Sequence, residues 1–144
     1  MKILVVRVRQ AEVWVRGVVY SSIREGIVVF VGIEKGDNSS VIKEMAEKIV
    51  NLRIFEDTRG KLHYSVKDKG YQIMCVPNFT LCAHTKKGNR PSFEQALPFL
   101  EAKKFFEDFI LILKSYWREI EKGEFGEHME ISLVADGPVN IILG

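Results

Sequence analysis

The N-terminal part of the chain shows a spacing of apolar residues that predicts β-strands. Valine and arginine alternate over residues 6–9, a second alternation falls at Val13 and Val15, and residues 27–31 form a continuous apolar run. Period-two alternation indicates a strand with one buried face, whereas a short unbroken run indicates a strand buried on both faces. We therefore expect three strands within residues 2–33, the last of them in the interior.

Two later segments repeat their apolar residues at helical spacing. After the turn cluster EKGDNSS, Ser39 or Ser40 is placed to cap a first helix. A second helix is expected from about 98 to 122, with Gly123 placed to end it. Its aromatic stripe is more typical of a core than of a cofactor site. The apolar positions are Ile42, Met45, Ala46, Ile49 and Val50 in the first helix, and Ala102, Phe105, Phe106, Phe109, Leu113, Trp117 and Ile120 in the second.

The remaining apolar stretches predict further strands. Short strands are expected around 53–55 and over 72–76, with a turn at 59–60 between them. Apolar residues at alternate positions over 129–133 and again over 139–143 predict two terminal strands. The whole chain, 1–144, is therefore expected to form a single α+β domain, a mostly antiparallel sheet with two covering helices.

A Gly137-Pro138 pair lies between the two predicted terminal strands. Proline has no N–H to donate to a strand ladder, and glycine adopts backbone angles that other residues avoid. Taken alone, the pair is typical of a tight turn. The alternative is that a Gly-Pro peptide, in the cis form if the fold requires it, presents bare backbone to a ligand.

Composition narrows the class of protein. With 144 residues, 47% hydrophobic and 28% charged, the chain fits one ordinary globular domain. Its formal net charge of +2 is too small to indicate nucleic-acid binding by itself. We find no apolar run of the roughly 18 residues that a membrane span needs and no signal-peptide core, so we expect a cytoplasmic protein without a membrane partner. Cys75 and Cys82 are expected to be core thiols.

Residues that could carry chemistry are few. The chain has no glycine-rich phosphate loop, CxxC pair or G-x-S-x-G motif. His63, His84 and His128 lack metal-ligand spacing, so we expect neither a metal nor a cofactor. The most informative stretch is 76–93, VPNFTLCAHTKKGNRPSF, in which a strand end is followed by Thr80 and a basic loop. A threonine in an ordinary β segment explains Thr80 equally well.

Six stretches together are far more specific than any single motif: AEVWVRG, GIVVFVGIEKGD, KIVNLRIFEDTRGKLHYSV, PNFTL, KKGNRPSF and GEFGEHMEISLVADGPV. Through them the sequence resembles the D-aminoacyl-tRNA deacylase family over nearly its whole length. The signature motifs of that family, Ser-Gln-x-Thr-Leu and Asn-x-Gly-Pro-x-Thr, correspond to residues 77–81 and 135–140. The chain departs from them at Pro77, Asn78, Ala135 and Asn140, changes that would alter the hydrogen bonds between the two loops or shift the substrate preference.

The resemblance implies a barrel-like deacylase fold and a homodimer that hydrolyses the ester of D-aminoacyl-tRNA at the subunit interface. In the family a cis Gly-Pro peptide reaches into the other subunit's pocket, binds the substrate amino group and excludes L side chains. Gly137 and Pro138, with Met129 beside them, would form this chiral gate. A site that must accept many side chains can exclude one enantiomer by a steric clash with rigid backbone, so this mechanism is physically reasonable. Glycyl-tRNA would escape the gate and become a secondary substrate.

For catalysis the resemblance implicates Asn78, Phe79 and Thr80. Backbone N–H groups around Phe79 and Thr80 would stabilise the oxyanion of the transition state. Thr80 could attack as a nucleophile, but the sequence shows no base beside it. Alternatively it positions the substrate while the ribose hydroxyl of the tRNA helps to activate water, and we favour this role.

Recognition of tRNA would fall to basic residues. Lys86, Lys87 and Arg90 lie in one glycine-containing loop, and Arg7 lies in the first strand region. Contacts between such residues and phosphates weaken with salt. A second hypothesis remains open: a non-catalytic relative that binds the acceptor end of tRNA, in which the altered motif residues reflect a lost activity.

Overall fold

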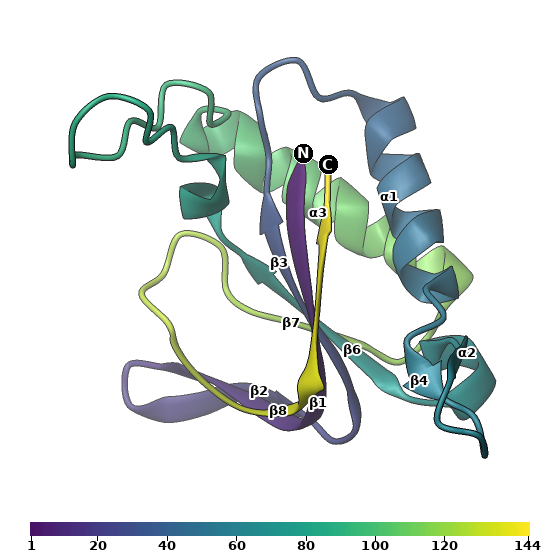
Figure 1. The fold of residues 1–144 in the computed structure, drawn as a ribbon. Coiled ribbons are helices and arrows are strands. Elements are labelled where there is room, and N and C mark those ends of the chain that lie inside the picture. Colours follow the sequence, from purple (N-terminus) through teal and green to yellow (C-terminus); the bar gives the residue numbers. More distant parts are fainter.

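The computed structural model describes all 144 residues and shows a mixed α+β fold (Figure 1). A curved sheet carries the two longer helices on one face. In chain order the elements are β1 (Lys2–Val15), β2 (Val18–Ile23), β3 (Gly26–Gly32), α1 (Ser39–Asn51), β4 (Phe55–Glu56), β5 (Leu62–Tyr64), α2 (Val66–Lys69), β6 (Gln72–Pro77), the 3-10 helix η1 (Phe79–Cys82), α3 (Phe99–Tyr116), β7 (Ile120–Lys122) and β8 (Glu130–Leu143).

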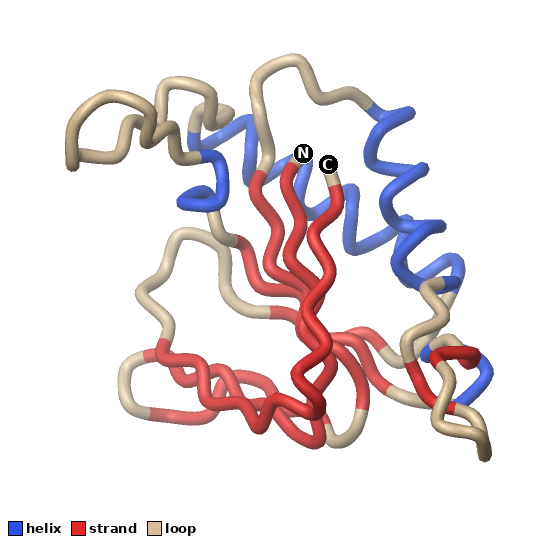
Figure 2. Tube along the Cα trace, viewed as in Figure 1, coloured by secondary structure: helices blue, strands red, loops and turns tan.

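Strand β1 organises the sheet because it pairs with three other strands. Its first half pairs with β3, its second half with β2, and its other edge follows β8, in each case antiparallel. The β3–β6 and β6–β7 pairs are parallel. The Ser21 hydroxyl donates to the Lys122 carbonyl at 2.8 Å and brings β2 against β7, so the sheet nearly closes on itself (Figure 2). The expected mostly antiparallel, barrel-like α+β fold is confirmed.

Apolar side chains cover both faces of the sheet and form two cores. On β3, Val29 faces the larger core under α1 and α3, whereas Val28 faces a smaller core inside the barrel together with Met74. Consecutive residues of a strand point to opposite faces of the sheet. The residues on both faces of a strand are therefore all apolar only when both faces are buried. This explains the unbroken run at 27–31 and confirms its interior position.

The N-cap of the first helix lies one or two residues earlier than the sequence pattern indicates. Asn38, rather than Ser39 or Ser40, is the N-cap residue, because its side-chain oxygen accepts from the backbone amides of Ser40 and Val41 at 3.0 and 3.1 Å. Asparagine is as good an N-cap as serine, so residue type alone does not distinguish Asn38 from the two serines that follow it.

The second helix is shorter than expected, and its predicted end at 122 was wrong. Helix α3 ends at Tyr116, and Trp117 takes extended backbone angles while its indole N–H donates to the Tyr71 carbonyl at 2.8 Å. Ile120, which continues the helical stripe, lies instead on β7 opposite Ile73. The backbone of this segment pairs with the edge of β6 instead of continuing the helix.

The chain after residue 129 forms one long strand instead of two strands joined by a turn. Along β1, Val6 pairs with Asn140 and Val8 pairs with Ala135, so residues 136–139 all stand opposite Arg7. One of the two register shifts in this pairing is this bulge and the other falls between Val8 and Gln10; the Gly137-Pro138 peptide within the bulge is cis. The tight-turn interpretation was therefore wrong, and the bulge presents its backbone outside the ladder.

Candidate active site

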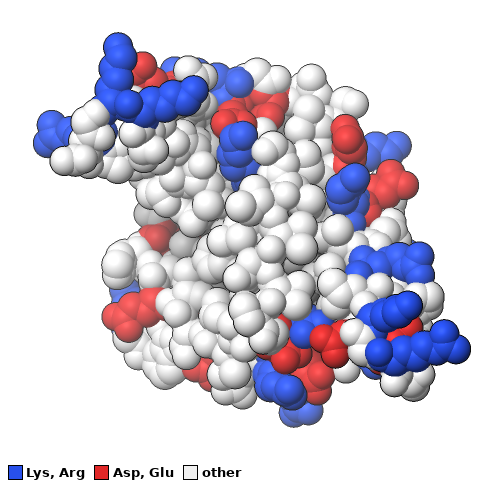
Figure 3. All heavy atoms as spheres, in the orientation of Figure 1, with Lys and Arg blue, Asp and Glu red and all other residues white.

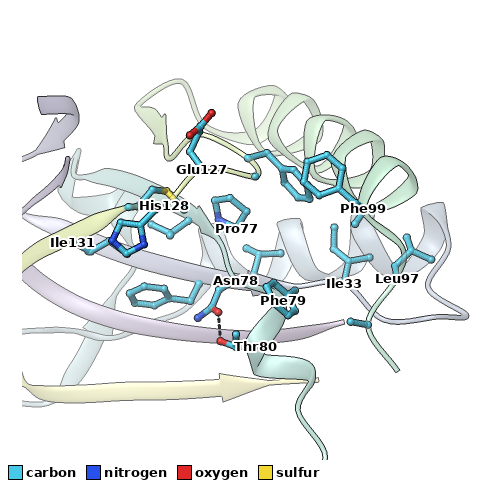
Figure 4. A pocket seen from close by; sticks show the side chains of 18 residues that line it. Ile33, Pro77, Asn78, Phe79, Thr80, Leu97, Phe99, Glu127, His128 and Ile131 are labelled. Carbon is cyan, nitrogen blue, oxygen red and sulfur yellow. Dashed lines mark hydrogen bonds between the residues drawn. The ribbon is translucent and has the colours of Figure 1, made fainter. Parts of the chain in front are cut away.

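A cleft of about 770 Å³ opens where β3 and β6 end (Figure 4). Four segments line it: the end of β3, the β6–η1 segment, the residues around the start of α3 and the loop that leads into β8. Of its 18 lining residues 12 are hydrophobic. Small-molecule sites are typically apolar clefts of this size with a few polar groups that fix orientation.

One wall of the cleft carries the predicted catalytic residues. The Asn78 amide donates to the Val31 carbonyl at 2.7 Å, which ties the start of η1 to the end of β3. The Thr80 hydroxyl donates to the side-chain oxygen of Asn78, as Figure 4 shows. Phe79, with 58% of its surface exposed, lines the cleft beside them. Asn78, Phe79 and Thr80 are thus brought together on one short segment.

Backbone donors accompany these side chains. The first amides of a helix have no carbonyl partner within it, and the Phe79 and Thr80 amides make no hydrogen bond beyond η1. Two free N–H groups on the wall of an apolar cleft can bind an oxyanion. The segment therefore has the donors that stabilisation of a tetrahedral intermediate requires.

The opposite wall contains residues that the sequence pattern did not single out. Met129 lies there, away from the Gly137 of the same chain, together with Phe99, Glu127 and His128. The sequence feature that could have identified this wall is the spacing of the glycines in GEFGEHM. Gly126 has φ +84°, and a Cβ on it would lie 2.6 Å from the Phe99 ring. Only glycine lets this loop approach the aromatic side chain so closely.

The cis Gly137-Pro138 peptide does not lie in the cleft of its own chain. Gly137 instead borders a separate polar hollow of about 370 Å³ with Arg7, Arg9 and Asp136. The two signature motifs therefore lie in different places on the folded chain.

Arg7 fixes the backbone next to the cis peptide. Its guanidinium donates to the carbonyls of Asp136 at 3.0 Å and Ile54 at 2.9 Å, and to the carboxylate of Glu56 at 3.3 Å. Only 6% of the side chain is exposed. This differs from the expected tRNA contact, because a guanidinium that is buried and bound on three sides cannot reach a phosphate. We assign Arg7 to positioning the bulge.

The basic loop projects from the body of the domain (Figures 1 and 3). His84 and Ser92 close its base through two backbone hydrogen bonds of 2.8 and 3.0 Å. Lys86, Lys87 and Arg90 are exposed within it and form no salt bridge. Unpaired cations on a projecting loop are free to meet an anionic partner.

The thiols and the other ionisable groups offer little further chemistry. Burial raises the pKa of Cys75 to about 12 and that of Cys82 to about 11, so both are neutral near pH 7. No three His, Cys, Asp or Glu side chains converge in a metal-binding arrangement. None of the helices combines the length and the apolar content that crossing a bilayer requires.

A family model described as D-Tyr-tRNA(Tyr) deacylase matches residues 4–144. The chain belongs to this deacylase family. Proteins named D-aminoacyl-tRNA deacylase are similar to it over nearly their full length. That of Carboxydothermus hydrogenoformans is 46% identical over 143 residues, 99% of each chain, and that of Thermosipho africanus is 43% identical over 143 residues, 99% of this chain and 96% of the relative.

Solved structures share the fold of this chain. The c-Myc DNA Unwinding Element Binding Protein superposes with a TM-score of 0.96 at 42% identity, covering 100% of this chain and 98% of that one. A probable eukaryotic D-amino acid tRNA deacylase superposes with a TM-score of 0.86 at 13% identity, over 99% and 97% of the two chains, which is a likeness of fold. The resemblance found in the sequence is confirmed, and with it the expectation of an enzyme of the deacylase class.

Proposed function

We propose that this deacylase hydrolyses the ester bond between a D-amino acid and the 3′-terminal adenosine of tRNA, and releases both. The observation that carries the proposal is the position of the Asn78–Thr80 segment on the wall of an apolar cleft of about 770 Å³. This segment is the counterpart of the first family motif. Proteins named D-aminoacyl-tRNA deacylase that are 43–46% identical to the chain support the substrate class.

The chemistry follows from the groups on the cleft wall. Attack of water on the ester places negative charge on the former carbonyl oxygen, and the Phe79 and Thr80 amides are free to bind it. The Thr80 hydroxyl donates a hydrogen bond to the side-chain oxygen of Asn78. The lone pairs of the Thr80 oxygen are then available to accept a hydrogen bond from the substrate. Ester hydrolysis needs less assistance than amide cleavage, so positioning and an oxyanion site suffice.

Thr80 acts by positioning rather than as a nucleophile. A threonine nucleophile needs a base within hydrogen-bond reach, and the only titratable residues that line the cleft are Glu127 and His128. Neither accepts a hydrogen bond from Thr80, and Figure 4 shows the Glu127 carboxylate pointing away from it. The ribose hydroxyl of the substrate is then the group that helps to activate water.

A homodimer would complete the site. Gly137 lies outside the cleft of its own chain, in a bulge that is displaced from the ladder with β1. Strand β8 pairs with β1 on one edge only, and Ile142 on it is 77% exposed. The Gly137-Pro138 carbonyls of one subunit would enter the partner's cleft near Met129, bind the substrate ammonium and leave no room for an L side chain. Glycyl-tRNA would pass this gate.

The tRNA body would bind through the basic loop. Lys86, Lys87 and Arg90 are exposed and unpaired there, and three phosphate contacts would make affinity fall with salt concentration. A tRNA substrate supports a cytoplasmic location for the protein.

The deciding experiment follows deacylation of matched D- and L-tyrosyl-tRNA by the purified protein, with a no-enzyme sample for spontaneous ester loss. Rapid release of D-tyrosine with the L ester spared is the expected result. Loss of both esters would mean that no chiral gate exists. If D-, L- and glycyl-tRNA all survive while tRNA is still bound, the protein is a binding relative without deacylase activity.

A further inference from the structure

We propose that Phe93, together with Phe79, forms a stacking platform for the unpaired nucleotide that precedes the terminal adenosine of the tRNA. The inference rests on the proposed function, because it assumes that the aminoacylated adenosine occupies the cleft. It adds a second nucleotide subsite, outside the cleft, that the deacylase activity by itself does not define.

The two rings form an exposed aromatic pair. Their centroids are 5.1 Å apart and their planes meet at 70°, an edge-to-face arrangement. Phe79 is 58% exposed and Phe93 is 37% exposed. In an edge-to-face pair the partner covers at most one face of each ring, so a flat face remains open for stacking. Two adjacent phenyl rings left in water favour a partner that covers them.

Position relative to the cleft decides which nucleotide is involved. Phe79 lines the cleft, whereas Phe93 packs against Phe79, is exposed and does not line the cleft, so we infer that Phe93 lies at its outer side. The Phe93 carbonyl accepts from the amide of Ala96 at 3.0 Å, and Ala96 lines the cleft, so the backbone of this outer residue is fixed relative to the site. A nucleic-acid strand that leaves the cleft past Phe79 therefore meets the Phe93 ring next.

The charges beyond Phe93 suit the backbone of the same strand. Phe93 directly follows the loop closed by the His84–Ser92 pairing, which carries Lys86, Lys87 and Arg90 and no acidic residue. Proteins that bind single-stranded nucleic acids combine aromatic side chains, on which bases stack, with cations that follow the phosphates. The Phe79–Phe93 pair, which lies between the apolar cleft and three unpaired cations, provides the same combination.

The test compares two substrates that differ only in the preceding nucleotides: the D-tyrosyl ester of adenosine and the D-tyrosyl ester of the trinucleotide CCA. We expect the wild-type protein to have a higher kcat/KM for the trinucleotide ester. Phe93→Ala should lower kcat/KM for the trinucleotide ester by about 10- to 100-fold, the range that one lost base–aromatic stack allows, and leave that for the adenosine ester unchanged. Phe93→Trp should retain the preference.

Controls separate stacking from packing and from failure of the proposed function. Phe93→Leu keeps apolar bulk without an aromatic face and should behave like Phe93→Ala. Leu100 is 80% exposed and does not line the cleft, so Leu100→Ala should leave kcat/KM unchanged for both esters. The inference would be overturned if Phe93→Ala lowered kcat/KM equally for both esters, lowered it for neither, or weakened the homodimer. If wild type hydrolyses both esters at equal rates, the platform is wrong and the deacylase stands; if it hydrolyses neither, the proposed function is wrong as well.

Discussion

The guanidinium of Arg7 donates from Nε to the main-chain carbonyl of Asp136 at 3.0 Å, one residue before the cis Gly137-Pro138 peptide. The same guanidinium reaches Ile54 and Glu56 on the far side, so it links the bulge of β8 to the segment around β4. A long bulge without a ladder partner would otherwise be free to move. Arg7 therefore sets where the Gly-Pro carbonyls point.

Replacing Arg7 by lysine tests this role. Lysine keeps the charge but cannot form three hydrogen bonds in a fixed planar geometry. We expect Arg7→Lys to lower the free energy of unfolding by about 2–3 kcal/mol, the value of one to two charge-assisted hydrogen bonds, and to reduce the D-over-L selectivity of deacylation. Chemical denaturation and the tyrosyl-tRNA assay measure the two effects.

Arg9→Lys is the matched control for this substitution. Arg9 is 66% exposed and meets only a carboxylate oxygen of Asp136, at 3.5 Å. Exposed pairs contribute little, so stability and selectivity should both stay near wild type. If Arg9→Lys and Arg7→Lys behave alike, Arg7 does not act through the Asp136 carbonyl.

Gly137 is expected to tolerate no side chain. Its φ is +140°, and a Cβ would lie 2.6 Å from the Val139 nitrogen and 2.9 Å from the Val139 Cγ2. Gly137→Ala should therefore lower the free energy of unfolding by about 1–3 kcal/mol, the cost of a residue held in such a region, and strongly reduce deacylation. Gly36→Ala provides the comparison, because Gly36 also has a positive φ, +93°, but a Cβ there meets nothing within 4 Å. Equal effects of the two substitutions on activity would show that the space around Gly137 is not required.

The sequence predicts the fold better than it predicts the local form of the site. Alternation and unbroken apolar runs report burial directly, so the strand at 27–31 and both long helices follow from them. The end of α3 does not, because Ile120 fits a helical stripe and a strand opposite Ile73 equally well. Likewise, alternation identifies residues 129–143 as β structure but cannot show that residues 136–139 all stand opposite Arg7.

Some residues of the candidate site could be predicted from the sequence and others could not. The segment at 78–80 could be found from its motif, and the structure places all three residues on one wall of a cleft. The burial of Arg7 could not be found, because an arginine in an alternating strand is normally solvent-facing and its partners Ile54 and Asp136 are distant in sequence. Phe99 and Glu127 were missed because only tertiary packing brings the GEFGEHM loop against the start of α3.

Substitutions at Thr80 separate the positioning role from the nucleophilic one. Thr80→Ser keeps the hydroxyl that donates to Asn78, whereas Thr80→Val removes it at nearly constant volume. If Thr80 only positions the substrate, Thr80→Val should lower the single-turnover rate by about 10-fold, equivalent to one ordinary hydrogen bond. A nucleophile would be indispensable, so a loss of about 10³-fold or more in Thr80→Val, with a covalent ester on Thr80 detected by mass spectrometry in the wild-type protein, would contradict the positioning role.

The buried thiols predict a loss of stability at alkaline pH. Burial raises the pKa of Cys75 from 9.0 to about 12, so the folded protein holds this proton at pH values where the unfolded chain has released it. The stabilisation is complete below pH 9 and is lost as the pH rises toward 12, because the unfolded state then binds fewer protons than the folded state. Cys75 alone should make the free energy of unfolding fall by about 1.4 kcal/mol per pH unit above pH 9.

Comparison with Cys75→Ala isolates this contribution, because both proteins share the other groups that titrate in this range, among them Cys82 and Tyr71, whose pKa values are also raised by burial. The alanine variant should start less stable, since it leaves a small cavity at a fully buried position. Between pH 9.5 and 11, however, its stability should decline more slowly than that of wild type, by about 1.4 kcal/mol per pH unit. Urea unfolding followed by tryptophan fluorescence at several pH values gives both slopes, and parallel slopes would mean that the Cys75 thiol loses its proton as readily in the folded protein as in the unfolded chain.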